Sequence, residues 1–165
     1  MPAVHELEFS VALAATPAEV FACLIRPAEV MTLTDPNAGV RLLNGPEVMA
    51  EGTANELEVV GFGVPQRVVY TVTAFEDRGP AGGTFTETMT KGPLPVFEND
   101  HAVSPASGGE PDAGCTVRET YRFAPPGGLL GFVLTADRLR SELEKGLAYR
   151  RAALLERFGA GPTAG

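Results

Sequence analysis

The sequence has little of what nucleic-acid-binding proteins or disulfide-stabilised domains require. It contains 13 Lys and Arg residues against 21 Asp and Glu, for a formal net charge of −8, and only two cysteines. A nucleic-acid-binding protein needs a basic surface that neutralises phosphates, so we expect no nucleic-acid partner. Cys23 and Cys115 lie in apolar segments without a short-spaced partner, which predicts buried thiols in a reducing compartment.

Long hydrophobic runs are absent as well. The longest, at residues 129–134, is far shorter than the roughly 20 residues that a membrane-spanning helix needs. Residues 1–10 have neither the basic nor the apolar region of a secretory signal. We therefore expect a cytoplasmic protein without stable membrane insertion. A length of 165 residues fits one domain, predicted at residues 1–158, with a disordered tail at residues 159–165.

Alternation and turn chemistry predict a run of β-strands after a short helical segment. Residues 4–13 alternate between apolar and polar side chains, as a half-buried strand does. Thr16, Pro17 and Glu19 then form a capping-box pattern that begins a helix, which Pro27 ends, and a second short helix follows. Further strands are expected between Gly- and Pro-rich turns, at residues 40–44, 53–60, 66–76, 84–91, 96–104 and 115–123.

A change of period marks the last element. Apolar residues recur there at spacings of three, four or seven, as on one face of a helix: Phe132, Ala136, Leu139, Leu143, Leu147, Leu154 and Phe158. Thr135 can cap this helix, or it can begin as early as Leu129. Its basic residues, Arg150 among them, are interleaved with glutamates and are interpreted as a solvated face.

A single curved sheet must cover its inner face, and only this last helix is large enough to do so. We therefore predict an α+β fold. A curved antiparallel sheet of six to seven strands wraps around the long C-terminal helix, and the two short helices after the first strand close one end.

Short motifs in residues 85–103, FTETMTKGPLPVFENDHAV, add to this layout. Phe-x-acid is followed by Gly-Pro and then by an aromatic-x-Asn-x-His strand, and residues 119–123 read acid-x-apolar-x-aromatic. With the order of elements over about residues 4–158, this combination resembles the START-like superfamily, also called SRPBCC, and the resemblance implies its helix-grip fold. In one bacterial branch of it the third motif has two histidines; here Asn99 stands where the first is usual, and His101 matches the second.

The resemblance implies a cavity between sheet and helix. The superfamily includes polyketide cyclase/dehydrase-like proteins and lipid-transfer domains. It also implies that apolar turns such as the one with Phe62 and Val64 rim the cavity entrance, although packing of this turn against the short helices is an alternative.

Polar residues occupy strand positions that the two-residue period turns inward: Asn55, Glu87, Asn99, His101 and Glu119. A buried polar group without a partner costs about 1–3 kcal/mol, and an isolated carboxylate costs more. These groups therefore either form a closed network, with His101 donating to Glu119 or Glu87, or line a hydrated cavity. Gly146 leaves space beside the helix for such a cavity.

Our leading hypothesis is that the chain binds a small, largely apolar molecule without changing it. Its apolar walls would come from Phe85, Met89, Phe97, Val117, Tyr121, Leu143 and Leu147, and its polar contacts from Glu87, Asn99, His101 and Glu119.

Two alternatives stay open. One is a cyclase/dehydratase-type enzyme with His101 and Glu119, or Glu87, as acid and base. The other is a protein-interaction module with a filled interior. We expect no cofactor, and the ligand-type residues lack the spacing of a metal site. A homodimer is left open.

Overall fold

The curved sheet predicted from the alternation is present in the computed structural model, which describes residues 2–61, 64–106 and 109–162. Seven strands pair in the order β1-β7-β6-β5-β4-β3-β2, and every neighbouring pair is antiparallel. The strands are β1 (His5–Leu13), β2 (Val40–Asn44), β3 (Ala54–Gly61), β4 (Val64–Asp77), β5 (Gly83–Lys91), β6 (Val96–Pro105) and β7 (Cys115–Ala124).

Four α-helices accompany the sheet in the described residues: α1 (Pro17–Leu24), α2 (Pro27–Thr32), α3 (Gly128–Val133) and α4 (Ala136–Phe158). Short 3-10 turns lie at Gly79–Ala81 and Pro111–Ala113. The capping box is confirmed, because the Thr16 side chain accepts from the Glu19 backbone and the Glu19 carboxylate accepts from the Thr16 backbone. Thr135 caps α4, so residues 128–133 form a separate short helix rather than its first turns.

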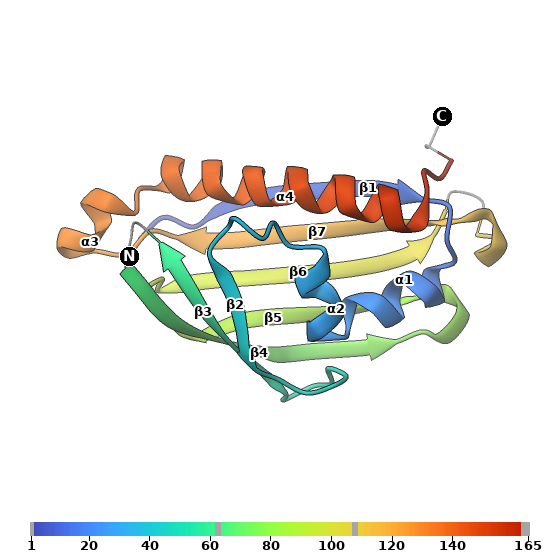
Figure 1. Ribbon diagram of the computed structural model, residues 1–165, viewed down its shortest axis with the longest axis horizontal. Helices are drawn as coiled ribbons and strands as arrows, with labels where there is room; N and C mark the ends of the chain where they lie inside the picture. The colour runs from blue at the N-terminus through green and yellow to red at the C-terminus, as the bar shows by residue number, and fades with distance from the viewer. Residues whose placement is uncertain (1, 62–63, 107–108, 163–165) are drawn as a thin grey trace.

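The layers follow from where the apolar faces lie. The helix α4 runs along β1 on the inner side of the sheet, with α1 and α2 toward one end of the molecule and α3 at the other (Figure 1). Phe21 of α1 packs against Phe75 and Phe85, with ring centroids 5.8 and 6.1 Å apart. Gly83 permits this contact, since a Cβ there would lie 2.6 Å from the Phe21 ring.

The chain continues along β1 after α4. Ala14 N donates to Gly159 O at 2.9 Å, Gly161 N donates to Ala12 O at 3.1 Å, and Leu13 forms a bridge with Ala160. The prediction of a disordered tail from residue 159 is therefore wrong for residues 159–161. Glycine permits this pairing, because a Cβ at position 161 would collide with the Leu13 carbonyl.

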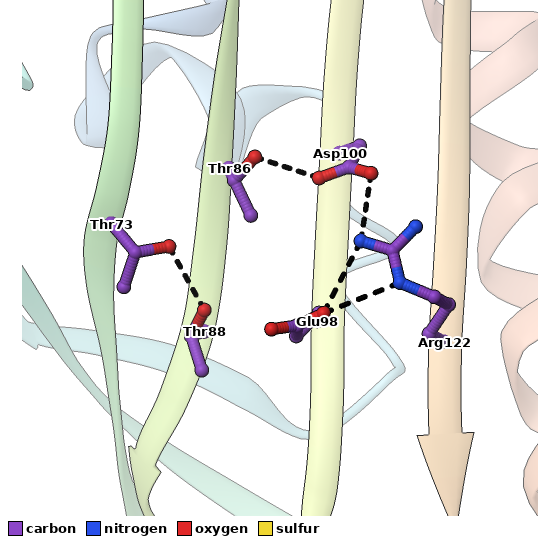
Figure 2. Close-up of polar contacts among 6 residues, drawn as sticks. All are labelled: Thr73, Thr86, Thr88, Glu98, Asp100 and Arg122. Atoms are coloured by element: carbon purple, nitrogen blue, oxygen red, sulfur yellow. Dashed lines mark hydrogen bonds and ion pairs between the residues drawn. The ribbon is translucent and has the colours of Figure 1, made fainter. Parts of the chain in front are cut away.

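The outer face of the sheet is polar, and its side chains pair across strands. Six of them are drawn in Figure 2: Thr73, Thr86, Thr88, Glu98, Asp100 and Arg122. Thr86 donates to Asp100 at 2.7 Å, and the Arg122 guanidinium lies 2.8 Å from the other oxygen of the same carboxylate. The polar side chains of the outer face thus have partners on neighbouring strands. The apolar side chains of the sheet lie on its other face, toward α1 and α4.

Candidate functional site

The strand register brings the predicted inward polar residues together in two neighbouring rows. Phe85, His101 and Glu119 lie opposite one another on β5, β6 and β7. Glu87, Asn99 and Tyr121 form the next row on the same three strands. Asn55 is the exception, because it lies on β3 opposite Tyr70 and donates to the Met49 sulfur.

Glu119 is at the centre of a buried polar network. Its side chain has 0% exposure, and its Oε1 lies 2.9 Å from His101 Nδ1 and 2.8 Å from Arg150 Nη2. Its Oε2 accepts a 3.3 Å hydrogen bond from the Tyr121 hydroxyl. Burial opposes ionisation, but the charges of Arg150 and His101 outweigh it and lower the pKa of Glu119 to about 2. Glu119 is therefore an ionised carboxylate with three partners.

Arg150 is the member of this network that the sequence analysis missed. We interpreted it as part of a solvated helix face, and that interpretation is wrong, because its side chain is only 13% exposed and faces the sheet. It continues the apolar stripe of α4 at helical spacing, after Leu143 and Leu147 and before Leu154. A charged residue within that stripe was the available signal.

The His101 side chain is fixed by two contacts, one with the Phe85 ring and one with the Glu119 carboxylate. Its ring stacks on Phe85, with centroids 4.2 Å apart and an interplanar angle of 11°. Since Nδ1 lies against an ionised carboxylate, the proton belongs on that nitrogen, and Nε2 is left enclosed with no partner among the described residues. The Asn99 Oδ1 atom is enclosed in the same way.

Glu87 lies beside this network but outside its hydrogen bonds. Burial raises the pKa of its carboxyl, the charges of His101 and Arg150 lower it, and the charge of Glu119 raises it further. The net direction is upward, opposite to that of Glu119. The two glutamates therefore differ in kind: Glu119 is an ion-pair partner with a lowered pKa, whereas the pKa of Glu87 is raised by burial.

A cavity of about 700 Å³ lies between the inner face of the sheet and α4. Its apolar lining includes Val40, Val59, Val68, Met89, Leu94, Phe97, Phe123, Leu134, Leu139, Leu143 and Leu147. Among the described residues, its polar lining consists of Thr34, Asp35, Gln66, Tyr70, Tyr121, Arg138, Glu142 and Arg150. Gly146 also lines it, and no atom lies within 4 Å of where a Cβ would be.

The predicted ligand contacts divide into two groups. Those that line the cavity are Met89, Phe97, Tyr121, Leu143 and Leu147. Those that do not are Phe85, Glu87, Asn99, His101, Val117 and Glu119. The physical reason is that α1 fills the other end of the sheet, where Phe85 and Val117 join the packed core.

Each central strand therefore changes character along its length. On β6 the inward residues run from Val103 in the core, through His101 and Asn99, to Phe97 at the cavity. The polar network is a belt between the packed core and the cavity, and Tyr121 and Arg150 are the belt residues that reach the cavity.

Part of the cavity rim is apolar, although the exposed residues Arg138 and Glu142 also line the cavity. Leu130 and Val133 of α3 line it, while Leu129 and Phe132 of the same helix are 86% and 81% exposed. Val64 also lines the cavity and is 59% exposed, as the resemblance implied for this turn. Phe62 lies outside the described residues.

Two further features bear on the kind of site. Within the ranges that the structure describes, no three His, Cys, Asp or Glu side chains are grouped so as to hold a metal ion. Among those residues, no helix is both long enough and apolar enough to cross a bilayer.

Comparisons with known proteins agree with this architecture. Residues 4–154 match a family model described as polyketide cyclase / dehydrase and lipid transport. No curated protein matches the chain by sequence.

Several solved structures share the fold. Norcoclaurine synthase from Thalictrum flavum, in complex with dopamine and hydroxybenzaldehyde, has a TM-score of 0.62 at 12% identity, over 94% of this chain and 88% of that one. The Zhui aromatase/cyclase from Streptomyces sp. R1128 has a TM-score of 0.60 at 17% identity, over 94% and 93%. Ara h 8.0201 has a TM-score of 0.57 at 16% identity, over 93% and 99%. At such identities the likeness concerns the fold alone.

Proposed function

The chain belongs to the family of polyketide cyclases, dehydrases and lipid-transport proteins, and from that premise we propose that it binds a small, largely apolar molecule without chemistry. The observation that carries the proposal is the cavity of about 700 Å³ under α4. Small-molecule sites typically enclose roughly 300–1,000 Å³ and are lined mainly by apolar side chains with a few polar groups. Met89, Phe97 and Leu143 supply such a lining here.

The placement of His101 favours binding over acid–base catalysis. A general base must come within hydrogen-bond reach of the proton that it takes. The imidazole lies between Phe85 and Glu119, outside the cavity lining, and its Nδ1 is engaged by the carboxylate. The family includes enzymes as well as transport proteins, so the cyclase/dehydratase alternative is an outcome of the experiment below.

The cavity also argues against a pure protein-interaction module, for which we expected a filled interior. We further propose that the protein works in the cytoplasm. Cys23 and Cys115 are free and buried, which suits a reducing compartment.

Titration with 1-aminoanthracene, a neutral apolar fluorophore, tests the proposal. We expect saturable binding with one molecule per chain. Gly146→Leu places a side chain in the cavity and should weaken binding at least tenfold, whereas Ala148→Leu, an exposed position on the same helix, should not change it. Absence of saturable binding, or equal affinities in the two variants, would contradict the proposal.

The same preparation separates binding from catalysis. Native mass spectrometry of protein purified from its own host should show a co-purifying molecule of unchanged structure. The enzymatic alternative instead expects pH-dependent turnover of aromatic polyketide-like substrates, which His101→Ala would abolish while 1-aminoanthracene still binds.

A further inference from the structure

We infer that the bound molecule is uncharged and carries a carbonyl-type oxygen, which accepts a hydrogen bond from Arg150. The inference rests on the proposed binding function and specifies the chemistry of the ligand. It follows from the donors of Arg150, from the charges around it and from its position in the cavity.

The guanidinium of Arg150 has N–H groups that no acceptor among the described residues engages. A guanidinium carries five N–H groups and no acceptor, and no hydrogen bond joins Arg150 to another residue in the described part of the chain. Its Nη2 forms a close ion pair with Glu119, at 2.8 Å, but without the alignment of a hydrogen bond. Its Nε and Nη2 are enclosed, which leaves Nη1 as the nitrogen that a molecule in the cavity can reach.

The Tyr121 hydroxyl cannot take that role, because it already donates its proton to Glu119. Tyr70 also lines the cavity, but its hydroxyl can accept as well as donate and so sets no requirement on the ligand. Arg150 can only donate, and an acceptor oxygen on the ligand satisfies it.

The charges select a neutral acceptor rather than an anion. Glu119 lies directly behind Arg150 and neutralises it, and Asp35 and Glu142 line the cavity together with Arg138. A carboxylate on the ligand would add negative charge to a site with no positive surplus, in a chain of net charge −8. A carbonyl oxygen gains a charge-assisted hydrogen bond without burying an ion.

The leucines of α4 that line the cavity indicate where the apolar part of the ligand lies. Arg138 and Arg150 both line it and are twelve residues apart on α4, about 18 Å at the rise of an α-helix. Leu139, Leu143 and Leu147 lie between them on the same face. A hydrocarbon or aromatic body packs along these leucines, with the oxygen toward Arg150.

Three naphthalenes with one ring body test the inference: 2-acetylnaphthalene, 2-ethylnaphthalene and 2-naphthoate. Each is used to displace 1-aminoanthracene from the protein at pH 7. Because a hydrogen bond to a charged group is worth roughly tenfold or more in affinity, the ketone should bind at least about tenfold tighter than the hydrocarbon. It should also bind tighter than the carboxylate.

Two variants assign the preference to Arg150. The double variant Glu119→Gln with Arg150→Met removes the cation and its counter-charge together, so neither is left buried alone; the ketone preference should fall to within about twofold. Glu119→Gln alone leaves Arg150 without its counter-charge and should shift the preference toward 2-naphthoate. Arg151→Met, an exposed neighbour that donates to the Ser10 carbonyl, should retain the wild-type order.

The outcomes distinguish the two proposals. Equal binding of the ketone and the hydrocarbon, or tightest binding of the carboxylate by the wild type, overturns the inference and leaves the binding function standing. Binding of none of the three, with no displacement and no saturable fluorophore binding, overturns both.

Discussion

Replacing Glu119 by glutamine tests the buried network at its centre. Burial raises the pKa of this carboxyl, but the charges of Arg150 and His101 bring it down to about 2, from the usual 4.5. A carboxyl whose pKa is lower in the folded state stabilises the fold above its unfolded pKa, and this stabilisation is lost as the pH falls from about 4.5 toward 2. The gap between the two pKa values corresponds to about 3 kcal/mol at neutral pH.

A second estimate gives a similar magnitude. Removing one partner of a buried ion pair costs about 3–5 kcal/mol, because the other charge is left without compensation. In Glu119→Gln that charge is Arg150, which keeps no other carboxylate within ion-pair distance among the described residues. We therefore expect the variant to lose about 3 kcal/mol of unfolding free energy at pH 7, and the difference from wild type to shrink as the pH approaches 3.

Urea unfolding followed by circular dichroism at pH 7, 5 and 3 measures both quantities. Glu98→Gln is the matched control, since Glu98 pairs with Arg122 on the outer face, where both side chains are partly exposed (Figure 2). An ion pair of that kind is worth about 1 kcal/mol or less. A loss below about 1 kcal/mol for Glu119→Gln at pH 7, or a loss that does not change with pH, would refute the reasoning.

Three further substitutions probe the surroundings of the site. In urea unfolding, Glu87→Gln should be more stable than wild type at pH 8 and no more stable at pH 4. Burial raises the pKa of Glu87, so its ionisation opposes folding as the pH rises. A gain in stability at pH 4 that disappears at pH 8 would contradict this reasoning. Gly83→Ala should lower stability by about 1–3 kcal/mol in thermal unfolding, since its Cβ would meet Phe21 and the Glu76 carbonyl, whereas Gly127→Ala, which meets nothing within 4 Å, should have little effect. Thr16→Ala should cost about 1 kcal/mol by loss of the α1 cap, and Thr16→Ser should restore it.

The fold could be predicted because its signals are local. Alternation located the seven strands to within about two residues, and the capping residues Thr16 and Thr135 marked the starts of α1 and α4. Strand faces also followed from the period of two, so Asn99, His101 and Glu119 were expected inward, where they are buried. Antiparallel order then made them neighbours.

The division between core and cavity could not be predicted in the same way. Phe85 and Met89 are apolar residues on one face of β5, yet Phe85 is packed under Phe21 and Met89 lines the cavity. Which end of the sheet is filled depends on where α1 sits, and that is a property of the tertiary structure. Arg150 was missed for a different reason: charge was given more weight than its place in the stripe of α4.

The two ends of α4 are fastened unequally. At its C-terminal end, the Gly159 carbonyl accepts from Ala14, and Arg157 lies 2.7 Å from Glu29 of α2. At its N-terminal end, Arg140 donates to the Glu6 carbonyl of β1, and the preceding helix α3 exposes Leu129 to solvent. Among the described residues, backbone hydrogen bonds join the α4 segment to β1 only beside Gly159, so we expect the N-terminal end to move away from the sheet more readily. Amide hydrogen exchange should therefore be faster in its first two turns than in its last two.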